Sequence, residues 1–115
     1  MKIKLKKTNF VTFVYALYWH NKIRYCLIIP NLGHEGLVTA IEEEYDVVDP
    51  SIDDFCIRKS SVDGDILVHR VAEKDDLLDK LIDHDRAAMI ELQRRLREAK
   101  LDCPPLTDGA NLEMR

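Results

Sequence analysis

The stretch from Phe10 to Ile29 constrains the fold most, because it is apolar on both of its alternating faces. Phe10 to Trp19 is dense in β-branched and aromatic residues, which favour a strand, and Ile23 to Ile29 resumes the pattern after His20-Asn21-Lys22. We therefore predict a β-hairpin. A strand that is apolar on both faces needs cover on both. Helices can cover one face, and the other must meet the chain's own tail or a second molecule.

Two more segments have strand patterns. Phe55 to Lys59 and Asp65 to Val71 predict a second hairpin around Val62-Asp63-Gly64, where Asp-Gly supplies the turn. Near the start, Lys2 to Lys6 alternates lysine with apolar residues, which is typical of an edge strand protected by lysine.

Two segments have helical spacing. Apolar residues recur in this way between Leu37 and Val48, and Pro50 ends that short helix at Asp49. The pattern from Glu73 to Lys100 predicts a longer helix, with acids at its start and bases at its end, as the helix dipole favours. At ~1.5 Å per residue it would reach about 40 Å, so it must kink or protrude. The expected fold class is α+β: an antiparallel sheet of two hairpins, with an added N-terminal edge strand, packed against a short helix and a long, kinked C-terminal helix.

Length and composition indicate an ordinary globular protein. The chain has 115 residues, which suits one domain; we place it at residues 1–100, followed by an extended or disordered tail at 101–115. Three cysteines without a Cys-x-x-Cys pair predict neither a disulfide framework nor a zinc site, so a reducing cytoplasm is the simplest location. Residues 1–22 can also be read as a secretory signal, but no small-x-small cleavage site follows the apolar run. That run is too short to span a bilayer.

Charge is sorted along the chain, whose net charge is −4. Residues 1–34 carry six bases and no acid, whereas residues 35–85 carry sixteen acids against five bases. The acidic middle favours cationic partners and repels nucleic acid. We therefore expect neither nucleic acid nor a membrane as a partner.

The acidic run from Glu42 to Asp54 is the main candidate site. We expect a docking surface for a cationic protein, with aromatic anchors beside the acids. The alternative is that the run is only a solvated face. The residues assigned to this surface are Glu42, Glu43, Asp46, Asp49, Asp53 and Asp54, with Tyr45 and Phe55 as the anchors.

Asp85 falls within the apolar stripe of the predicted long helix. Buried there, its carboxylate would need a partner, for which Arg24 and Arg70 are the candidates. Alternatively the helix breaks near Asp83, and Asp83 or Asp85 caps a second segment. We expect the break, because it also resolves the length of the helix.

No catalytic or metal signature is present in the sequence. His34 lacks the second histidine that a helical zinc site uses, and His84 does not share a helix face with Asp83 or Asp85. The sequence contains no phosphate-binding, dinucleotide-binding or nucleophile-elbow motif. We expect no cofactor and no metal.

A small acidic α+β protein with the run Glu42 to Asp54 and a second cluster at Asp75, Asp76 and Asp79 resembles the immunity proteins of contact-dependent inhibition and related polymorphic toxin systems. The resemblance implies stoichiometric inhibition of a cognate toxin, often a basic nuclease, through a charged interface. Two alternatives stay open. One is a homodimeric structural or adaptor protein joined through the apolar hairpin. The other is a small metal-assisted hydrolase or nuclease that uses Asp85 with His34 or His69.

Overall fold

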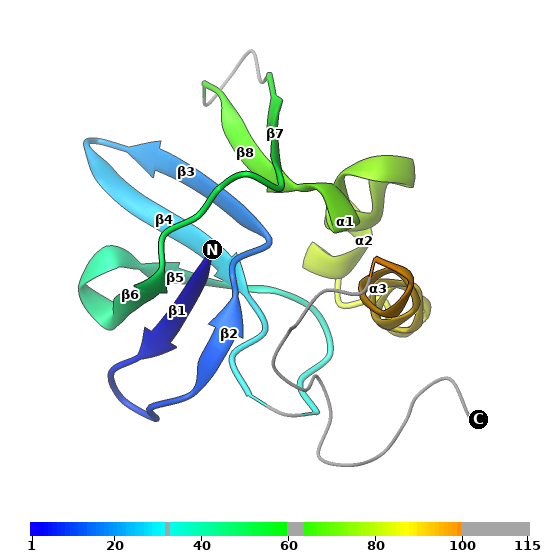
Figure 1. The fold of residues 1–115 in the computed structure, drawn as a ribbon, viewed down its shortest axis with the longest axis horizontal. Helices are drawn as coiled ribbons and strands as arrows, with labels where there is room; N and C mark the ends of the chain where they lie inside the picture. Colours follow the sequence, from blue (N-terminus) through cyan, green and yellow to red (C-terminus); the bar gives the residue numbers. More distant parts are fainter. Residues whose placement is uncertain (32, 60–63, 100–115) are drawn as a thin grey trace.

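The fold is α+β, as predicted, with eight short strands preceding three helices in the described residues (Figure 1). It is seen in a computed structural model that describes residues 1–31, 33–59 and 64–99. The elements in chain order are β1 (Lys2–Leu5), β2 (Val11–Phe13), β3 (Ala16–His20), β4 (Ile23–Ile28), β5 (Val38–Ile41), the 3₁₀ turn η1 (Glu42–Glu44), β6 (Tyr45–Asp49), β7 (Phe55–Arg58), β8 (Ile66–His69), α1 (Arg70–Glu73), the 3₁₀ turn η2 (Lys74–Asp76), α2 (Leu77–Ile82) and α3 (Arg86–Glu98).

The strands form two antiparallel sheets, ordered β2-β1-β6 and β5-β4-β3-β8-β7. β2 leads into β3 after only two residues, and η1 alone separates β5 from β6, so both segments bend from one sheet into the other. The pairing therefore runs in a closed ring from β1 through β2/β3, β4 and β5/β6 back to β1. This ring is a small barrel, and β8 and β7 extend the larger sheet beyond it.

The first predicted hairpin is confirmed as β3 and β4, but the predicted strand from Phe10 to Trp19 is divided: its first part forms β2, which pairs with β1 in the smaller sheet. Tyr18 lies opposite Tyr25, and Trp19 lies opposite Arg24. The chain reverses at Asn21 and Lys22, whose φ angles are 53° and 66°. Positive φ at both central residues is the geometry that matches the twist of two paired strands.

Two clusters of buried side chains lie on opposite faces of this hairpin, which explains why its strands are apolar on both sides. One cluster fills the barrel and is formed by Ile3, Val14, Leu17, Cys26, Ile28, Ala40 and Tyr45. The other lies between the larger sheet and the helices, and includes Phe13, Tyr15, Ala16, Val68, Leu78, Leu81, Met89 and Leu92. In the homodimer alternative, a second molecule covers one apolar face of the hairpin. In the structure that face points into the barrel, where β1, β2 and β6 of the same chain cover most of it. Removal of these apolar side chains from water supplies the main driving force for folding.

The long predicted helix is broken, as expected. α2 ends at Ile82, His84 has a φ of 61°, and α3 begins at Arg86. The Asp85 carboxylate accepts a hydrogen bond from the backbone N–H of Ala87 at 2.8 Å and so caps α3. Among the described residues, no helix is long and apolar enough to cross a membrane.

Two predicted elements are wrong. Residues 37–48 form no α-helix; they form β5, η1 and most of β6. β1 is the central strand of its sheet and not an edge, with Ile3 buried in the barrel. The second hairpin is confirmed as β7 and β8, although Val62 and Asp63 of its turn lie outside the described residues, as does the predicted tail 101–115.

Candidate functional site

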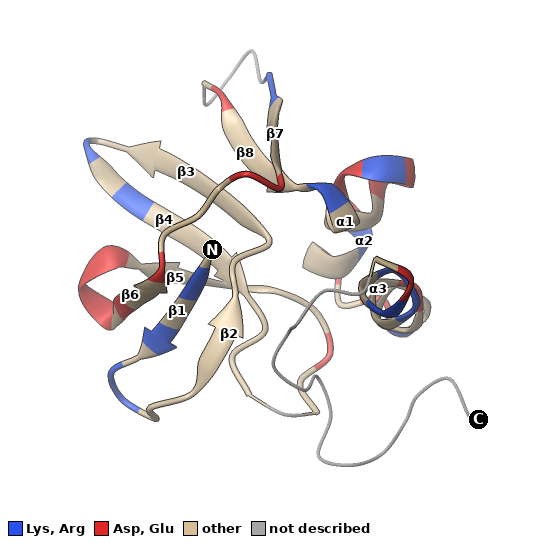
Figure 2. Ribbon diagram, viewed as in Figure 1, with Lys and Arg blue, Asp and Glu red and all other residues tan. Residues whose placement is uncertain are grey.

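The acidic run divides into three parts in the structure. Glu42, Glu43 and Glu44 form η1 at one end of the barrel, where Figure 2 shows them together. Asp46 and Asp49 lie on β6, and Asp53 and Asp54 precede β7 near the helices. The predicted site residues therefore do not form one patch.

Several of these carboxylates lie close to bases of the same chain. Asp54 pairs with Arg70, with 3.0 Å between Oδ1 and Nε. Asp46 and Asp49 lie opposite Lys4 and Lys2 across the β1–β6 ladder. Opposite charges facing each other across strands are favourable, by roughly 0.2–1 kcal/mol. These acids therefore contribute less to an outward field than the sequence predicts.

Three acids of the run accept hydrogen bonds from groups nearby in the sequence. Glu44 accepts a hydrogen bond from the Ile41 N–H at 2.8 Å, which fixes the start of η1. Asp49 accepts one from the Ser51 N–H at 3.0 Å, and Asp53 accepts one from the Ser51 hydroxyl at 3.2 Å. Side chains of this kind stabilise turns by bonding to nearby backbone and hydroxyl groups.

Tyr45 is not an exposed anchor, because only 3% of it is accessible and its ring lies inside the barrel. Its hydroxyl accepts hydrogen bonds from Arg24 Nε at 2.9 Å and from Cys26 Sγ at 3.0 Å. Burial raises the pKa of Tyr45 to about 12, and burial likewise raises the pKa of the Cys26 thiol. Tyr45, Arg24 and Cys26 thus form a hydrogen-bonded cluster at the barrel core.

Phe55 is half-buried and packs against the barrel core and edge-on against His69, with ring centroids 5.3 Å apart. It offers a partner only part of its ring. The exposed apolar side chains near the acids are others: Val48 and Ile52 are about half exposed and stand among Asp46, Asp49 and Asp53 in sequence.

Trp19 is the exposed aromatic residue that the sequence analysis did not assign to the site. It is 50% accessible at the end of β3, opposite Arg24. Arg24 in turn bonds to Tyr45, the residue after η1, and the hydrogen bond with Tyr45 is the main reason that its pKa is raised, with a smaller contribution from Glu42. Arg24 is therefore opposite the exposed tryptophan in the β3–β4 pairing and bonds to the residue that follows the acidic turn. The sequence feature that could have identified Trp19 is a large aromatic residue next to a predicted hairpin turn.

The proposed buried ion pair of Asp85 with Arg24 or Arg70 does not exist. Asp85 is exposed and caps α3, while Arg24 bonds to Tyr45 and Arg70 to Asp54. The long apolar stripe that placed Asp85 inside belongs to two separate helices.

Two histidines of the hydrolase alternative make contacts within the chain. His69 is 3% accessible; its Nδ1 accepts a hydrogen bond from the Val71 N–H at 3.2 Å and caps α1. Burial lowers its pKa from 6.5 to about 4. His34 instead lies edge-on against His84, with 5.6 Å between ring centroids. Within residues 1–31, 33–59 and 64–99, no group of three His, Cys, Asp or Glu side chains could hold a metal ion.

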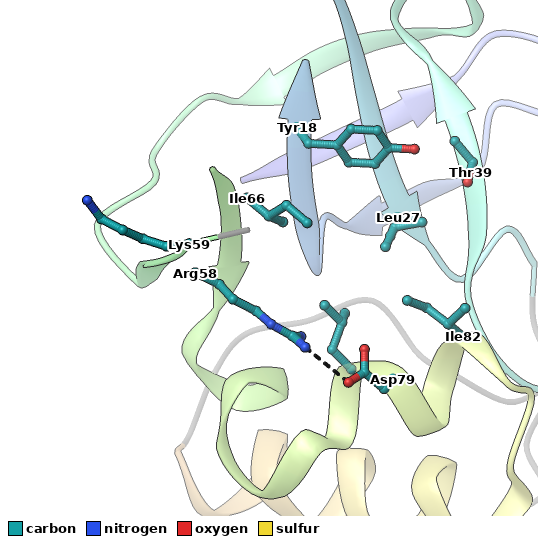
Figure 3. A pocket seen from close by; sticks show the side chains of 9 residues that line it. Tyr18, Leu27, Thr39, Arg58, Lys59, Ile66, Asp79 and Ile82 are labelled. Atoms are coloured by element: carbon teal, nitrogen blue, oxygen red, sulfur yellow. Dashed lines mark hydrogen bonds and ion pairs between the residues drawn. The ribbon is translucent and has the colours of Figure 1, made fainter. Parts of the chain in front are cut away.

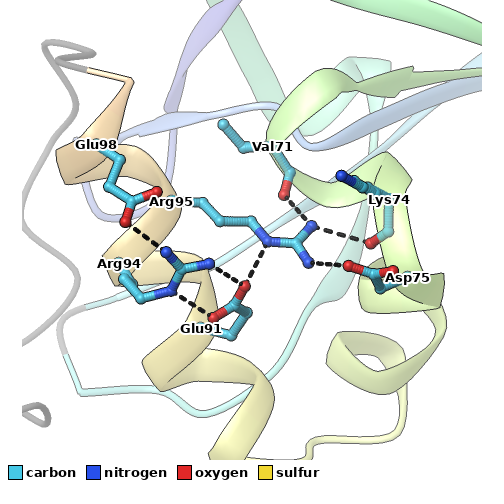
Figure 4. A network of polar contacts seen from close by, with 7 residues as sticks. All are labelled: Val71, Lys74, Asp75, Glu91, Arg94, Arg95 and Glu98. Atoms are coloured by element: carbon cyan, nitrogen blue, oxygen red, sulfur yellow. Dashed lines mark hydrogen bonds and ion pairs between the residues drawn. The ribbon is translucent and has the colours of Figure 1, made fainter.

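Arg95 fixes α3 to the start of the helical layer (Figure 4). Its guanidinium donates to the backbone carbonyls of Val71 and Lys74, at 3.1 and 2.9 Å, and contacts Asp75 at 3.2 Å. It also donates to Glu91 at 2.8 Å. Hydrogen bonds from Arg94 and Arg95 lower the pKa of Glu91 to about 2. Near the end of α3, Arg94 and Arg95 thus bond to acids and backbone carbonyls of the same chain.

A groove of about 550 Å³ lies between the outer face of the larger sheet and α2 (Figure 3). Arg58 of β7 and Asp79 of α2 form an ion pair across it, with 3.0 Å between Nη2 and Oδ2. The other lining residues are Tyr18, Leu27, Thr39, Lys59, Ile66, Leu78 and Ile82. Sequence analysis did not predict the groove, because its lining comes from six separate segments.

Comparisons with protein-family models, with curated proteins and with solved structures find no match to this chain. The chain is therefore classified by its fold alone. It is a small α+β domain in which a closed barrel carries an additional hairpin and a helical layer.

Proposed function

We propose that the chain is an immunity protein that binds and neutralises a cationic toxin, such as a basic nuclease domain, in the cytoplasm. The observation that supports the proposal is the acidic turn Glu42 to Glu44 at one end of the barrel, together with the exposed Trp19, which lies opposite Arg24 in the β3–β4 pairing. An exposed tryptophan beside charges is typical of protein interfaces, where aromatic and arginine side chains supply most of the binding energy.

The docking surface is narrower than the acidic run. It comprises Trp19, Glu42, Glu43 and the exposed Asp46, which lies opposite Lys4. Asp49 and Asp53 are left out because they bond to Ser51, Asp54 because it is paired with Arg70, and Tyr45 because it is buried. The acids would steer a cationic protein to this end of the barrel, and Trp19 would be buried on contact. The inhibitor would act by covering the toxin's substrate-binding surface, which requires no catalytic residue of its own.

The test uses two variants with equal changes of charge. One carries Glu42→Lys, Glu43→Lys and Asp46→Lys, and the control carries Asp65→Lys, Glu73→Lys and Asp83→Lys, which are exposed acids outside the docking surface. Tagged wild-type chain is purified from producing cells, and any protein that co-purifies in stoichiometric amount is identified and assayed for toxicity.

We expect a basic partner that co-purifies with wild type and control but not with the first variant, and whose toxicity the wild-type chain suppresses. A partner that is not toxic, or equal loss with both variants, would contradict the proposal.

A further inference from the structure

The groove between the larger sheet and α2 has an apolar floor. Leu27 and Ile66 contribute from the sheet, and Leu78 and Ile82 from α2. Ile82 is 42% accessible, so this part of the floor is open to solvent. A volume of about 550 Å³ lies within the range of roughly 300–1,000 Å³ found for small-molecule sites.

Polar groups stand at the two ends of this floor. Arg58 and Lys59 lie at the β7 end, where the Lys59 ammonium points outward (Figure 3). The hydroxyl-bearing side chains of Tyr18 and Thr39 lie at the other end. Asp79 pairs with Arg58, and because the Lys59 ammonium points outward, Arg58 is the cation that faces the floor.

The ion pair between Arg58 and Asp79 is open to exchange. Both side chains are about half exposed, at 42% and 52%. Exposed ion pairs are weak, because water screens them and two long side chains must be held in place. A ligand carboxylate could therefore replace Asp79 on the guanidinium, which binds carboxylates with two parallel hydrogen bonds.

We propose that the groove binds a small amphipathic monocarboxylate. Its carboxylate pairs with Arg58, and its apolar body covers Leu27, Ile66, Leu78 and Ile82. The Arg58 guanidinium, once it exchanges Asp79 for the ligand, selects an anion, and as the arginine that faces the floor it takes one carboxylate rather than two. This site is separate from the docking surface at Trp19 and the acidic turn, and it does not depend on the proposed immunity function.

Octanoate is the probe, with octylammonium and 1-octanol as matched compounds of opposite and no charge. Each is titrated into the ¹⁵N-labelled protein, and affinity and site are read from backbone amide shifts. Three exposed positions are varied: Arg58→Gln, Asp79→Asn, and Lys22→Gln as a control that removes a cation from the β3–β4 turn.

We expect octanoate to shift amides of β7, β8 and α2, and to bind more tightly than either matched compound. Arg58→Gln should weaken octanoate binding roughly ten-fold, as loss of a charged hydrogen bond does. Asp79→Asn should tighten it, because Arg58 is then released from its competitor, and Lys22→Gln should leave it unchanged. The proposal is overturned by absent binding, by equal binding of octanoate and octylammonium, or by an affinity that does not depend on Arg58.

Discussion

Gly36 offers the sharpest test of how the barrel is joined to the helices. It lies in the loop before β5, at the corner between α2 and α3, where the next residue, Leu37, donates its N–H to the Leu81 carbonyl at 2.9 Å. The φ of Gly36 is +94°, and an added Cβ would lie 2.6 Å from His84 Cδ2 and 2.8 Å from His84 Cα. Gly33 is a matched control, because its φ is +81° but nothing lies within 4 Å of an added Cβ.

The two alanine substitutions therefore differ by one effect. In both, an L-residue is forced into positive φ, which costs about 1–2 kcal/mol. Only Gly36→Ala also overlaps a neighbour, and since one of the atoms is a backbone Cα, a change of side-chain rotamer cannot relieve it. Overpacking of this kind costs a further ~1–3 kcal/mol.

Urea unfolding of the two variants measures these free energies. We expect Gly33→Ala to lower the free energy of unfolding by about 1–2 kcal/mol and Gly36→Ala by roughly 2–5 kcal/mol. Equal losses in the two variants would refute the contact between Gly36 and the α2–α3 corner.

Three other substitutions probe the helical layer. Arg95→Met should lower the free energy of unfolding by on the order of 2 kcal/mol, because two backbone carbonyls lose their donor; Arg94→Met, whose partners are all on α3, should change little. His69 has a folded pKa of about 4, below its ordinary 6.5, so the unfolded chain takes up the proton first as pH falls. Stability should therefore drop between pH 6.5 and 4, by on the order of 3 kcal/mol, and urea unfolding of His69→Asn should lack most of that slope. Asp85→Ala should cost about 1 kcal/mol through loss of the cap, and thermal unfolding should show no such loss for Asp83→Ala.

The hairpins and the helix break could be predicted because local chemistry decides them. Asn21 tolerates positive φ in the turn of the first hairpin, and the two faces of its strands are apolar for the reason inferred, since each faces a core. Asp85 caps α3 through a bond to a residue two positions away, so the sequence around it contains the information.

The segment from residue 37 to 48 could not be predicted correctly, because its spacing imitates a helix. β5 buries Ala40, and η1 then shifts the phase so that Tyr45 is the next residue to point into the barrel. A strand interrupted by one 3₁₀ turn thus produces the apolar intervals of a helix. Local pattern cannot separate the two, because pairing with β4 and β1 decides between them.

The candidate site was predicted less well than the fold, because neutralisation of charge is a matter of tertiary structure. Asp54 meets Arg70 from a segment 16 residues away, and the acids of β6 face lysines that begin the chain. The burial of Tyr45 and the exposure of Trp19 follow from the closure of the barrel, which pairs strands remote in sequence.

The most direct test of the docking surface is the association rate with the co-purified toxin, measured by stopped flow over a range of ionic strength. Wild-type chain should associate more slowly as salt rises, because salt screens the steering charges. The variant with Glu42, Glu43 and Asp46 changed to lysine should associate slowly at low salt and lose most of that dependence. The same rate and the same salt dependence in wild type and variant would contradict the proposed docking surface.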